Sequence, residues 1–130
     1  MRPQALGFLE KAQTLLDEAG TMLNVGLTDQ AGRTAYIAGF HTAQTLIFDR
    51  IGKVLKSHKG VQAEFRRWPK NDSRIDSELR GFLSRTYNLK AIADYETGPG
   101  SHVPREEATA ALEAAKEFLA CVTSLLTAAT

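Results

Sequence analysis

The sequence predicts an all-α protein, an antiparallel up-and-down bundle of four long helices and one short helix. Residues that favour helices, chiefly Ala, Leu, Glu, Lys and Arg, dominate the 130-residue chain, which holds only 4 prolines. Apolar side chains recur with the 3.6-residue period of a helix over four long stretches. A chain of this length can bury a sizeable core, so we expect residues 1–130 to fold as a single domain.

The first helix is expected from about residue 4 to residue 24. Leu9, Leu16 and Leu23 recur there at intervals of seven, and alanines and further leucines fill the same stripe. Residues 25–27 contain a glycine and end the pattern. The stripe predicts an amphipathic helix that packs one face against the bundle.

The second helix is expected to be long, from about residue 29 to residue 56, with Thr28 or Asp29 suited to cap its first turn. Its apolar residues lie on more than one face, which is typical of a helix in the middle of a bundle or at a subunit interface. Small residues such as Gly32 and Gly39 would let a neighbouring backbone approach closely.

The remaining helices are predicted from prolines and glycines that end helices and from apolar residues at helical spacing. A short helix is expected over residues 60–67, ended by Trp68-Pro69, and a long one over about 74–94. Residues 97–101 form a Gly/Pro-rich break, after which Pro104 suits the first position of the last helix. That helix has a regular apolar stripe: Ala108, Leu112, Ala115, Leu119, Val122 and Leu126.

Charge is unevenly distributed along the chain. The formal net charge is only +1, but residues 50–74 hold eight basic and two acidic residues, a net charge of +6. The segments before and after carry −2 and −3. A basic middle segment is suited to phosphate or an acidic partner, although extra lysines in a solvated loop would give the same count.

Several functional classes are not expected. The single cysteine, Cys121, lies in an apolar helical stretch, which indicates a buried thiol in a reducing cytoplasm. The N-terminal residues lack the apolar core of a signal peptide, and no apolar run is long enough to cross a bilayer. No spacing of His, Cys or Glu is typical of a metal site. We therefore expect a soluble cytoplasmic protein without a metal.

Two polar signatures interrupt these apolar stripes, and packing alone requires neither of them: Lys56-Ser57-His58-Lys59-Gly60-Val61 and Ala93-Asp94-Tyr95. They follow Arg33…Tyr36…Phe40-His41 in the chain, and Tyr87 comes shortly before the second of them. Their order and spacing, from about residue 8 to residue 122, resemble the HEPN domain of prokaryotes. The closest resemblance is to an uncharacterised subgroup with His-Lys-Gly-Val and Ala-Asp-Tyr signatures. Ala35 departs from that subgroup, which usually has a tyrosine there, and Ser57 replaces its threonine.

The resemblance implies a helical bundle that forms a homodimer and needs no cofactor. Many HEPN proteins are encoded beside a minimal nucleotidyltransferase, and the two act as a toxin–antitoxin module. Active HEPN toxins are metal-independent ribonucleases whose Arg-x(4–6)-His motifs meet across the dimer interface. In such a motif histidine transfers the proton of a ribose 2′-hydroxyl, and arginine stabilises the charged phosphorane.

This chain contains no Arg-x(4–6)-His motif, because seven residues separate Arg33 from His41 and Arg50 from His58. The candidate catalytic residues are Arg85, Asp94, His41 and His58. An exposed aspartate has a pKa of about 4 and is a poor base at neutral pH. The candidate RNA-, nucleotide- or partner-binding residues are Arg33, Tyr36, Lys56, His58, Lys59, Arg66, Arg67 and Tyr95.

Each candidate also has a purely structural interpretation. His41 is suited to helix packing, His58 to capping the C-terminus of the second helix, and Arg85 and Asp94 to an ion pair with each other. Three functions remain open: a non-catalytic component that binds RNA, a nucleotide or a nucleotidyltransferase; a ribonuclease toxin with a rearranged site; and a helical dimerisation module without a role in nucleic-acid binding.

Overall fold

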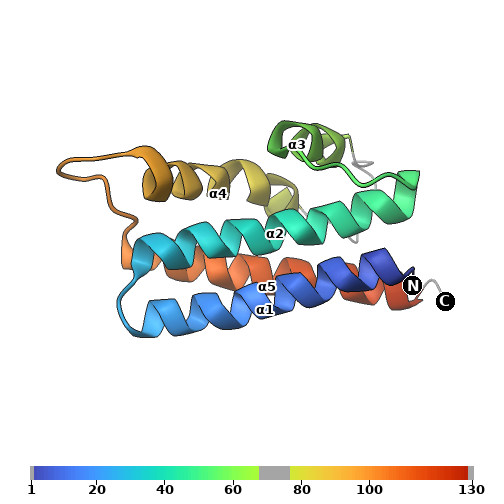
Figure 1. Ribbon diagram of the computed structural model, residues 1–130, viewed down its shortest axis with the longest axis horizontal. Coiled ribbons are helices and arrows are strands. Elements are labelled where there is room, and N and C mark those ends of the chain that lie inside the picture. Colours follow the sequence, from blue (N-terminus) through green and yellow to red (C-terminus); the bar gives the residue numbers. More distant parts are fainter. Residues whose placement is uncertain (1, 68–76, 129–130) are drawn as a thin grey trace.

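The protein is described by a computed structural model that covers residues 2–67 and 77–128. Within these residues the regular structure is five helices and no strand: α1 (Pro3–Asn24), α2 (Thr28–Ile51), α3 (His58–Arg66), α4 (Ser77–Tyr95) and α5 (Arg105–Ala128). Long helices that follow one another in the chain run in opposite directions, and the short α3 lies over one end of α2 (Figure 1). The prediction of an all-α bundle is confirmed.

Helix α2 forms the centre of the bundle and contacts every other helix. Most of its side chains between Ala31 and Phe48 are buried, so its sequence is apolar or small around the whole helix. Gly39 faces the ring of Phe82 on α4, and a β-carbon at this position would overlap that ring. The space left by Gly39 is therefore filled by an aromatic ring, whereas the sequence led us to expect a neighbouring backbone there.

The outer helices α1 and α5 bury the stripes that the sequence predicts. On α1 the leucines spaced by seven are buried, and on α5 the buried stripe is Ala108, Leu112, Ala115, Leu119, Val122 and Leu126. Helix α3 joins the same core through Phe65, whose ring lies 5.3 Å from that of Phe118 on α5. Phe82 packs on the other side of Phe118, with centroids 6.0 Å apart. Aromatic pairs of this kind contribute about 0.5–1.5 kcal/mol each beyond the area they bury.

The predicted boundary between the second and third helices is wrong. Helix α2 ends at Ile51 instead of residue 56, because Gly52 adopts φ 72° and its N–H donates to the Phe48 carbonyl. This left-handed glycine is a common helix terminator. Helix α3 then begins at His58, two residues earlier than predicted, and the Ser57 hydroxyl caps it by accepting a hydrogen bond from the Gly60 N–H at 3.0 Å.

Neither Thr28 nor Asp29 caps α2, whose N-cap is Leu27 and carries no side-chain capping bond. Asp29 instead accepts a hydrogen bond from the Val103 N–H at 2.7 Å and contacts His102 Nδ1 at 2.9 Å. Burial works against ionisation of Asp29, but these hydrogen bonds outweigh it and lower the pKa of the carboxyl. Asp29 thereby attaches the α4–α5 connection to the start of α2.

Two sequence predictions lie outside the described residues: the helix break at Trp68-Pro69 and the start of the fourth helix at about residue 74. Within the described residues, no helix is both long enough and apolar enough to span a membrane.

Candidate functional site

A polar cluster lies where α2, α3 and α4 meet. Arg33, Tyr36 and Phe40 occupy positions i, i+3 and i+7 of α2, and Tyr87, Lys90 and Asp94 occupy the same spacing on α4. Residues at this spacing share one face of a helix. His58 and Gln62 of α3 complete the cluster. We call these eight residues the candidate site.

The centre of the candidate site is a hydrogen bond between the Tyr36 hydroxyl and His58 Nδ1, 2.8 Å apart. Tyr36 is completely buried, and Gln62 Nε2 donates a second hydrogen bond to its oxygen at 3.2 Å. Since the oxygen accepts from Gln62, its own proton is free to be donated to His58 Nδ1. The neutral imidazole then carries its proton on Nε2.

Burial shifts the pKa values of both Tyr36 and His58. Desolvation raises the pKa of Tyr36 to about 12, so the phenol stays protonated at physiological pH. Desolvation also lowers the pKa of His58, and the positive charges of Lys90 and Arg33 lower it further. His58 is therefore a neutral imidazole near pH 7. Its ring lies 4.6 Å from that of Phe40 and 5.5 Å from that of Tyr36, so aromatic contacts fix its orientation.

Beside this bond, one carboxylate is shared by two cations. Asp94 accepts hydrogen bonds from Arg33 Nε and from Lys90 Nζ, each at 2.7 Å. Lys90 is 9% exposed, which is unusual for a lysine, and its bond to Asp94 raises its pKa. The same bond, followed by that from Arg33, lowers the pKa of Asp94. All three groups are charged at neutral pH, and we call Arg33 and Lys90 the cation pair.

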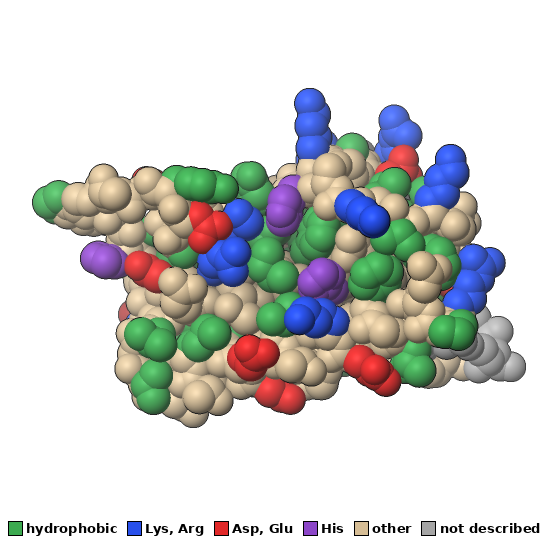
Figure 2. Space-filling view, viewed as in Figure 1, with side chains coloured by type: hydrophobic (Ala, Val, Ile, Leu, Met, Phe, Trp, Pro, Cys, Tyr) green, Lys and Arg blue, Asp and Glu red, His purple; other side chains and the backbone are tan. Residues whose placement is uncertain are grey.

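The candidate site therefore carries uncompensated positive charge. The two positive charges of the cation pair face the single negative charge of Asp94, while Tyr36 and His58 are neutral. Arg33 keeps 38% of its side chain exposed, so an anion in solution can reach it. Figure 2 shows histidine side chains on this face of the molecule among lysine and arginine side chains.

His41 lies on the other side of Phe40, with ring centroids 5.8 Å apart. Gln44 Nε2 donates to the Leu55 carbonyl at 2.7 Å, which turns the Gln44 oxygen toward His41 Nδ1, also at 2.7 Å. His41 Nδ1 is therefore the donor, and the neutral ring carries its lone pair on Nε2. Burial is the main cause that lowers the pKa of His41.

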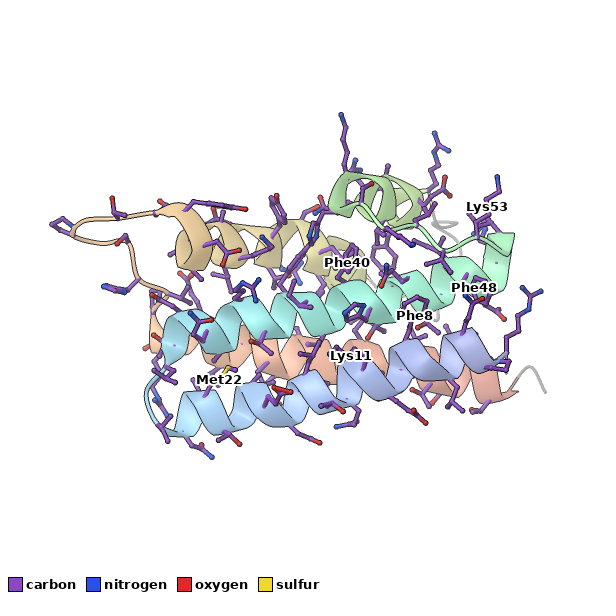
Figure 3. All side chains as sticks on the ribbon, viewed as in Figure 1. Phe8, Lys11, Met22, Phe40, Phe48 and Lys53 are labelled. Atoms are coloured by element: carbon purple, nitrogen blue, oxygen red, sulfur yellow. The ribbon has the colours of Figure 1, made fainter. Side chains whose placement is uncertain are left out.

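Two residues of α1 adjoin His41, and both are labelled in Figure 3. Phe8 stacks on the imidazole with centroids 6.1 Å apart, and the charge of Lys11 contributes to the lowered pKa. The expected packing role of His41 fits these contacts.

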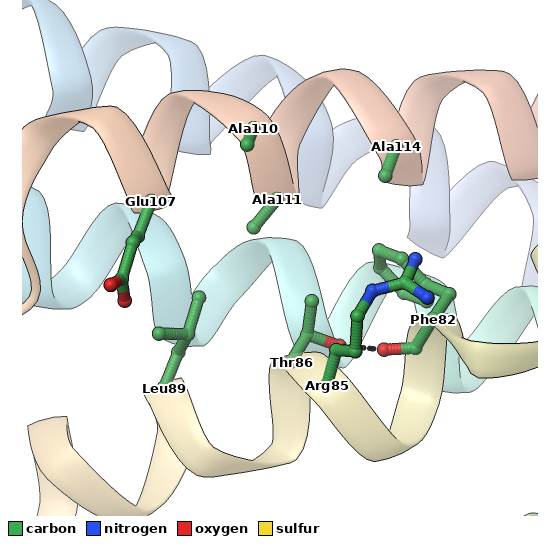
Figure 4. A pocket seen from close by; sticks show the side chains of 8 residues that line it. All are labelled: Phe82, Arg85, Thr86, Leu89, Glu107, Ala110, Ala111 and Ala114. Atoms are coloured by element: carbon green, nitrogen blue, oxygen red, sulfur yellow. Dashed lines mark hydrogen bonds between the residues drawn. The ribbon is translucent and has the colours of Figure 1, made fainter. Parts of the chain in front are cut away.

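Arg85 lies on a different side of α4. It lines a cavity of about 330 Å³ between α4 and α5 with Phe82, Leu89, Glu107 and three alanines (Figure 4). Asp94, nine residues later, lies about half a turn round the helix from Arg85 at 100° per residue. The expected ion pair between Arg85 and Asp94 is wrong, because Asp94 bonds Arg33 and Lys90 instead.

The structural interpretation of His58 also needs correction. His58 does not cap the C-terminus of α2; it is the first residue of α3, where the positive end of the helix dipole disfavours an imidazolium. Its bond to Tyr36 draws the start of α3 onto α2.

The predicted basic residues of α3 and of the connection before it are exposed: Lys56, Lys59, Arg66 and Arg67. Arg67 pairs with Glu64 at 3.1 Å, an exposed ion pair that contributes little to stability. Lysine and arginine side chains extend from this end of the molecule in Figure 2. Lys70 and Arg74, which belong to the same charged segment, lie outside the described residues.

Tyr95 is the last residue of α4 and is 73% exposed. Its ring lies 5.3 Å from Lys90 Nζ, within the range of a cation–π contact. Tyr95 therefore borders the cation pair. Among the residues that the structure describes, no group of three His, Cys, Asp or Glu side chains could hold a metal ion.

The predicted site residues did not include four members of the candidate site: Phe40, Gln62, Tyr87 and Lys90. Phe40 and Tyr87 stand among the residues that carry the HEPN resemblance, but no role was expected for them there. The i, i+4 spacing of Lys90 and Asp94 is a readable signal for an ion pair on one helix face. Arg33 is 61 residues from Asp94 in the chain, so no local pattern predicts that contact. Gln62 likewise reaches Tyr36 only because α3 lies across α2.

The sequence pattern of the HEPN domain matches residues 5–125, which is most of the chain. No curated protein matches the chain.

Proposed function

Because this chain belongs to the HEPN domain family, we propose that it is a component of a prokaryotic toxin–antitoxin-type module that binds RNA or a nucleotide. In this proposal it forms a homodimer and acts with a minimal nucleotidyltransferase. Family membership supports the partner and the dimer, and the chemistry of the candidate site supports the ligand.

One observation supports the ligand most directly: two cations from different helices share a single carboxylate. A phosphate oxygen that approaches Arg33 meets a guanidinium, which suits bidentate phosphate recognition, and a nearby ammonium. The exposed cations of α3 lie outside the candidate site and would add contacts to a longer ligand. Binding of this kind depends on neutralised phosphates and therefore weakens with salt.

Fluorescence anisotropy of a labelled RNA oligonucleotide tests this part of the proposal. With one phosphate neutralised by the cation pair, log K should fall against log[salt] with a slope of about −0.7, and further contacts to α3 would steepen it. Absent or salt-independent binding would overturn the RNA proposal and favour a dimerisation module. Co-purification of the protein with a minimal nucleotidyltransferase from its own host tests the partner.

A second candidate function is a metal-independent ribonuclease, and the lone pair on His41 Nε2 favours it. A neutral imidazole can take the proton of a ribose 2′-hydroxyl, whose oxygen then attacks the adjacent phosphorus and expels the 5′-oxygen. The expelled oxygen takes a proton from water. Incubation of total RNA with the protein in chelator tests this function, and cleavage that persists in His41→Asn would argue against His41 as the base.

A further inference from the structure

We propose that Tyr87 and Tyr95 stack two unpaired bases of a single-stranded RNA whose phosphate is held by the cation pair. This inference rests on the proposed function and specifies its ligand. The two rings form an aromatic edge along α4, and we use that name for them below.

The exposure of the two rings is the first observation. Tyr87 is 39% exposed and Tyr95 is 73% exposed. Within residues 2–67 and 77–128, no other tyrosine or phenylalanine side chain is as exposed as either of them. Isolated exposed apolar side chains are ordinary on a protein surface. These two rings are not isolated. Both lie on α4, and both border the charged residues of the candidate site.

The rings are also held in place. Tyr87 meets Tyr36 edge to face, with centroids 5.4 Å apart and planes at 70°, and lies 5.8 Å from the His58 ring. Tyr95 lies against the ammonium of Lys90. A ring whose position is fixed before binding loses less conformational entropy when a base stacks on it.

The spacing of the rings indicates the length of the ligand. Tyr95 follows Tyr87 by eight positions, which corresponds to about 12 Å along a helix. One base cannot cover both rings at that separation, so a mononucleotide would use only part of the edge. Bases of a duplex are already stacked on each other and are not free to stack on protein rings. A single strand with at least two splayed bases fits the aromatic edge best.

Charge along α4 matches the same ligand. Lys90 lies between the two tyrosines in sequence, and Arg33 reaches the same carboxylate from α2. Single-strand binding sites combine cations that follow the backbone with aromatic rings that stack the bases. The aromatic edge and the cation pair provide these two components on one surface.

Oligonucleotides that carry 2-aminopurine test the inference, because the fluorescence of this base responds to stacking. Binding to the native protein should change that fluorescence, and unlabelled single strands should compete better than a duplex. Tyr95→Leu should weaken binding about tenfold and remove the fluorescence change, while Tyr95→Phe keeps both. Tyr87→Leu and Tyr87→Phe should differ in the same way.

The salt dependence separates the failure of this inference from the failure of the proposed function. The leucine variants should keep the native salt slope, because neither tyrosine carries a charge. Suppose that the native protein binds RNA with a steep salt dependence and that both leucine variants bind like it. The proposed stacking on the aromatic edge is then refuted, while phosphate binding by the cation pair is still supported. If the native protein binds no RNA, both proposals fail. Tyr95 is so exposed that its variants should fold even if those of Tyr87 do not.

Discussion

The hydroxyl of Tyr36 lies 2.8 Å from Nδ1 of His58, so a fully buried phenol links the central helix α2 to the first residue of α3. Gln62, one turn further along α3, donates to the same oxygen. The bond therefore serves two purposes: it positions α3, and it fixes which imidazole nitrogen of His58 carries the proton.

Removal of the Tyr36 hydroxyl should destabilise the protein. In Tyr36→Phe the half-buried polar groups of His58 and Gln62 lose their partner, which should lower the free energy of unfolding by about 1–3 kcal/mol. Urea unfolding followed by circular dichroism measures the change. Tyr87→Phe is the matched control, since it removes a hydroxyl from a partly exposed ring and should cost less than about 0.5 kcal/mol. Equal losses in the two variants would refute the structural role of the bond.

Stability should fall as the pH drops below the ordinary histidine pKa of about 6.5. Burial lowers the pKa of both His58 and His41 in the folded state, so the unfolded chain binds more protons below that pH. The loss begins near pH 6.5 and continues until the pH reaches the lowered values. His58→Asn keeps a polar group near Nδ1 but cannot titrate, and should show a smaller loss between pH 7.5 and pH 5. A native-sized loss in this variant and in His41→Asn would contradict the account.

Gly39 should not tolerate a side chain. In Gly39→Ala the new methyl group would overlap the Phe82 ring, and overpacking of this kind costs about 1–3 kcal/mol. Gly7→Ala is a suitable control because no atom lies near its added β-carbon; it should stabilise the helix by about 0.5–1 kcal/mol. Thermal unfolding of the two variants should therefore shift in opposite directions, and a stabilised Gly39→Ala would show that α4 does not approach α2 as described.

Asp94 should limit the affinity of the candidate site for anions. In Asp94→Asn the cation pair keeps both charges and loses its carboxylate, so RNA should bind several times more tightly at low salt. Anisotropy titrations at constant salt measure the change. Weaker binding in a folded Asp94→Asn would mean that the carboxylate orients the cations for the ligand and does not compete with it.

The sequence was sufficient to predict the helices because their apolar stripes are local and regular. The leucines of α1 and the stripe of α5 are buried where the 3.6-residue period places them. The end of α2 was predicted too late, although Gly52 is a recognisable terminator, because the basic residues after it are also compatible with a helix. Helix propensity was a poorer guide there than the left-handed glycine.

The candidate site could be predicted only in part. The resemblance to HEPN drew attention to Arg33, Tyr36, His58 and Asp94, and the structure brings these four residues together. Their partners Gln62 and Tyr87 depend on how α3 and α4 pack against α2, which no local pattern specifies. Arg85 was grouped with the same site because it is close to Asp94 in sequence, yet the turn of the helix directs it to the α5 side.

The central claim is that the cation pair binds phosphate, and the salt dependence of RNA binding by Arg33→Gln tests it most directly. Lys116→Gln is the matched control, because it removes the same charge from an exposed position on α5. The account predicts that Arg33→Gln binds more weakly and reduces the salt slope by about 0.7, while Lys116→Gln binds like the native protein. Indistinguishable slopes and affinities in the two variants would contradict it.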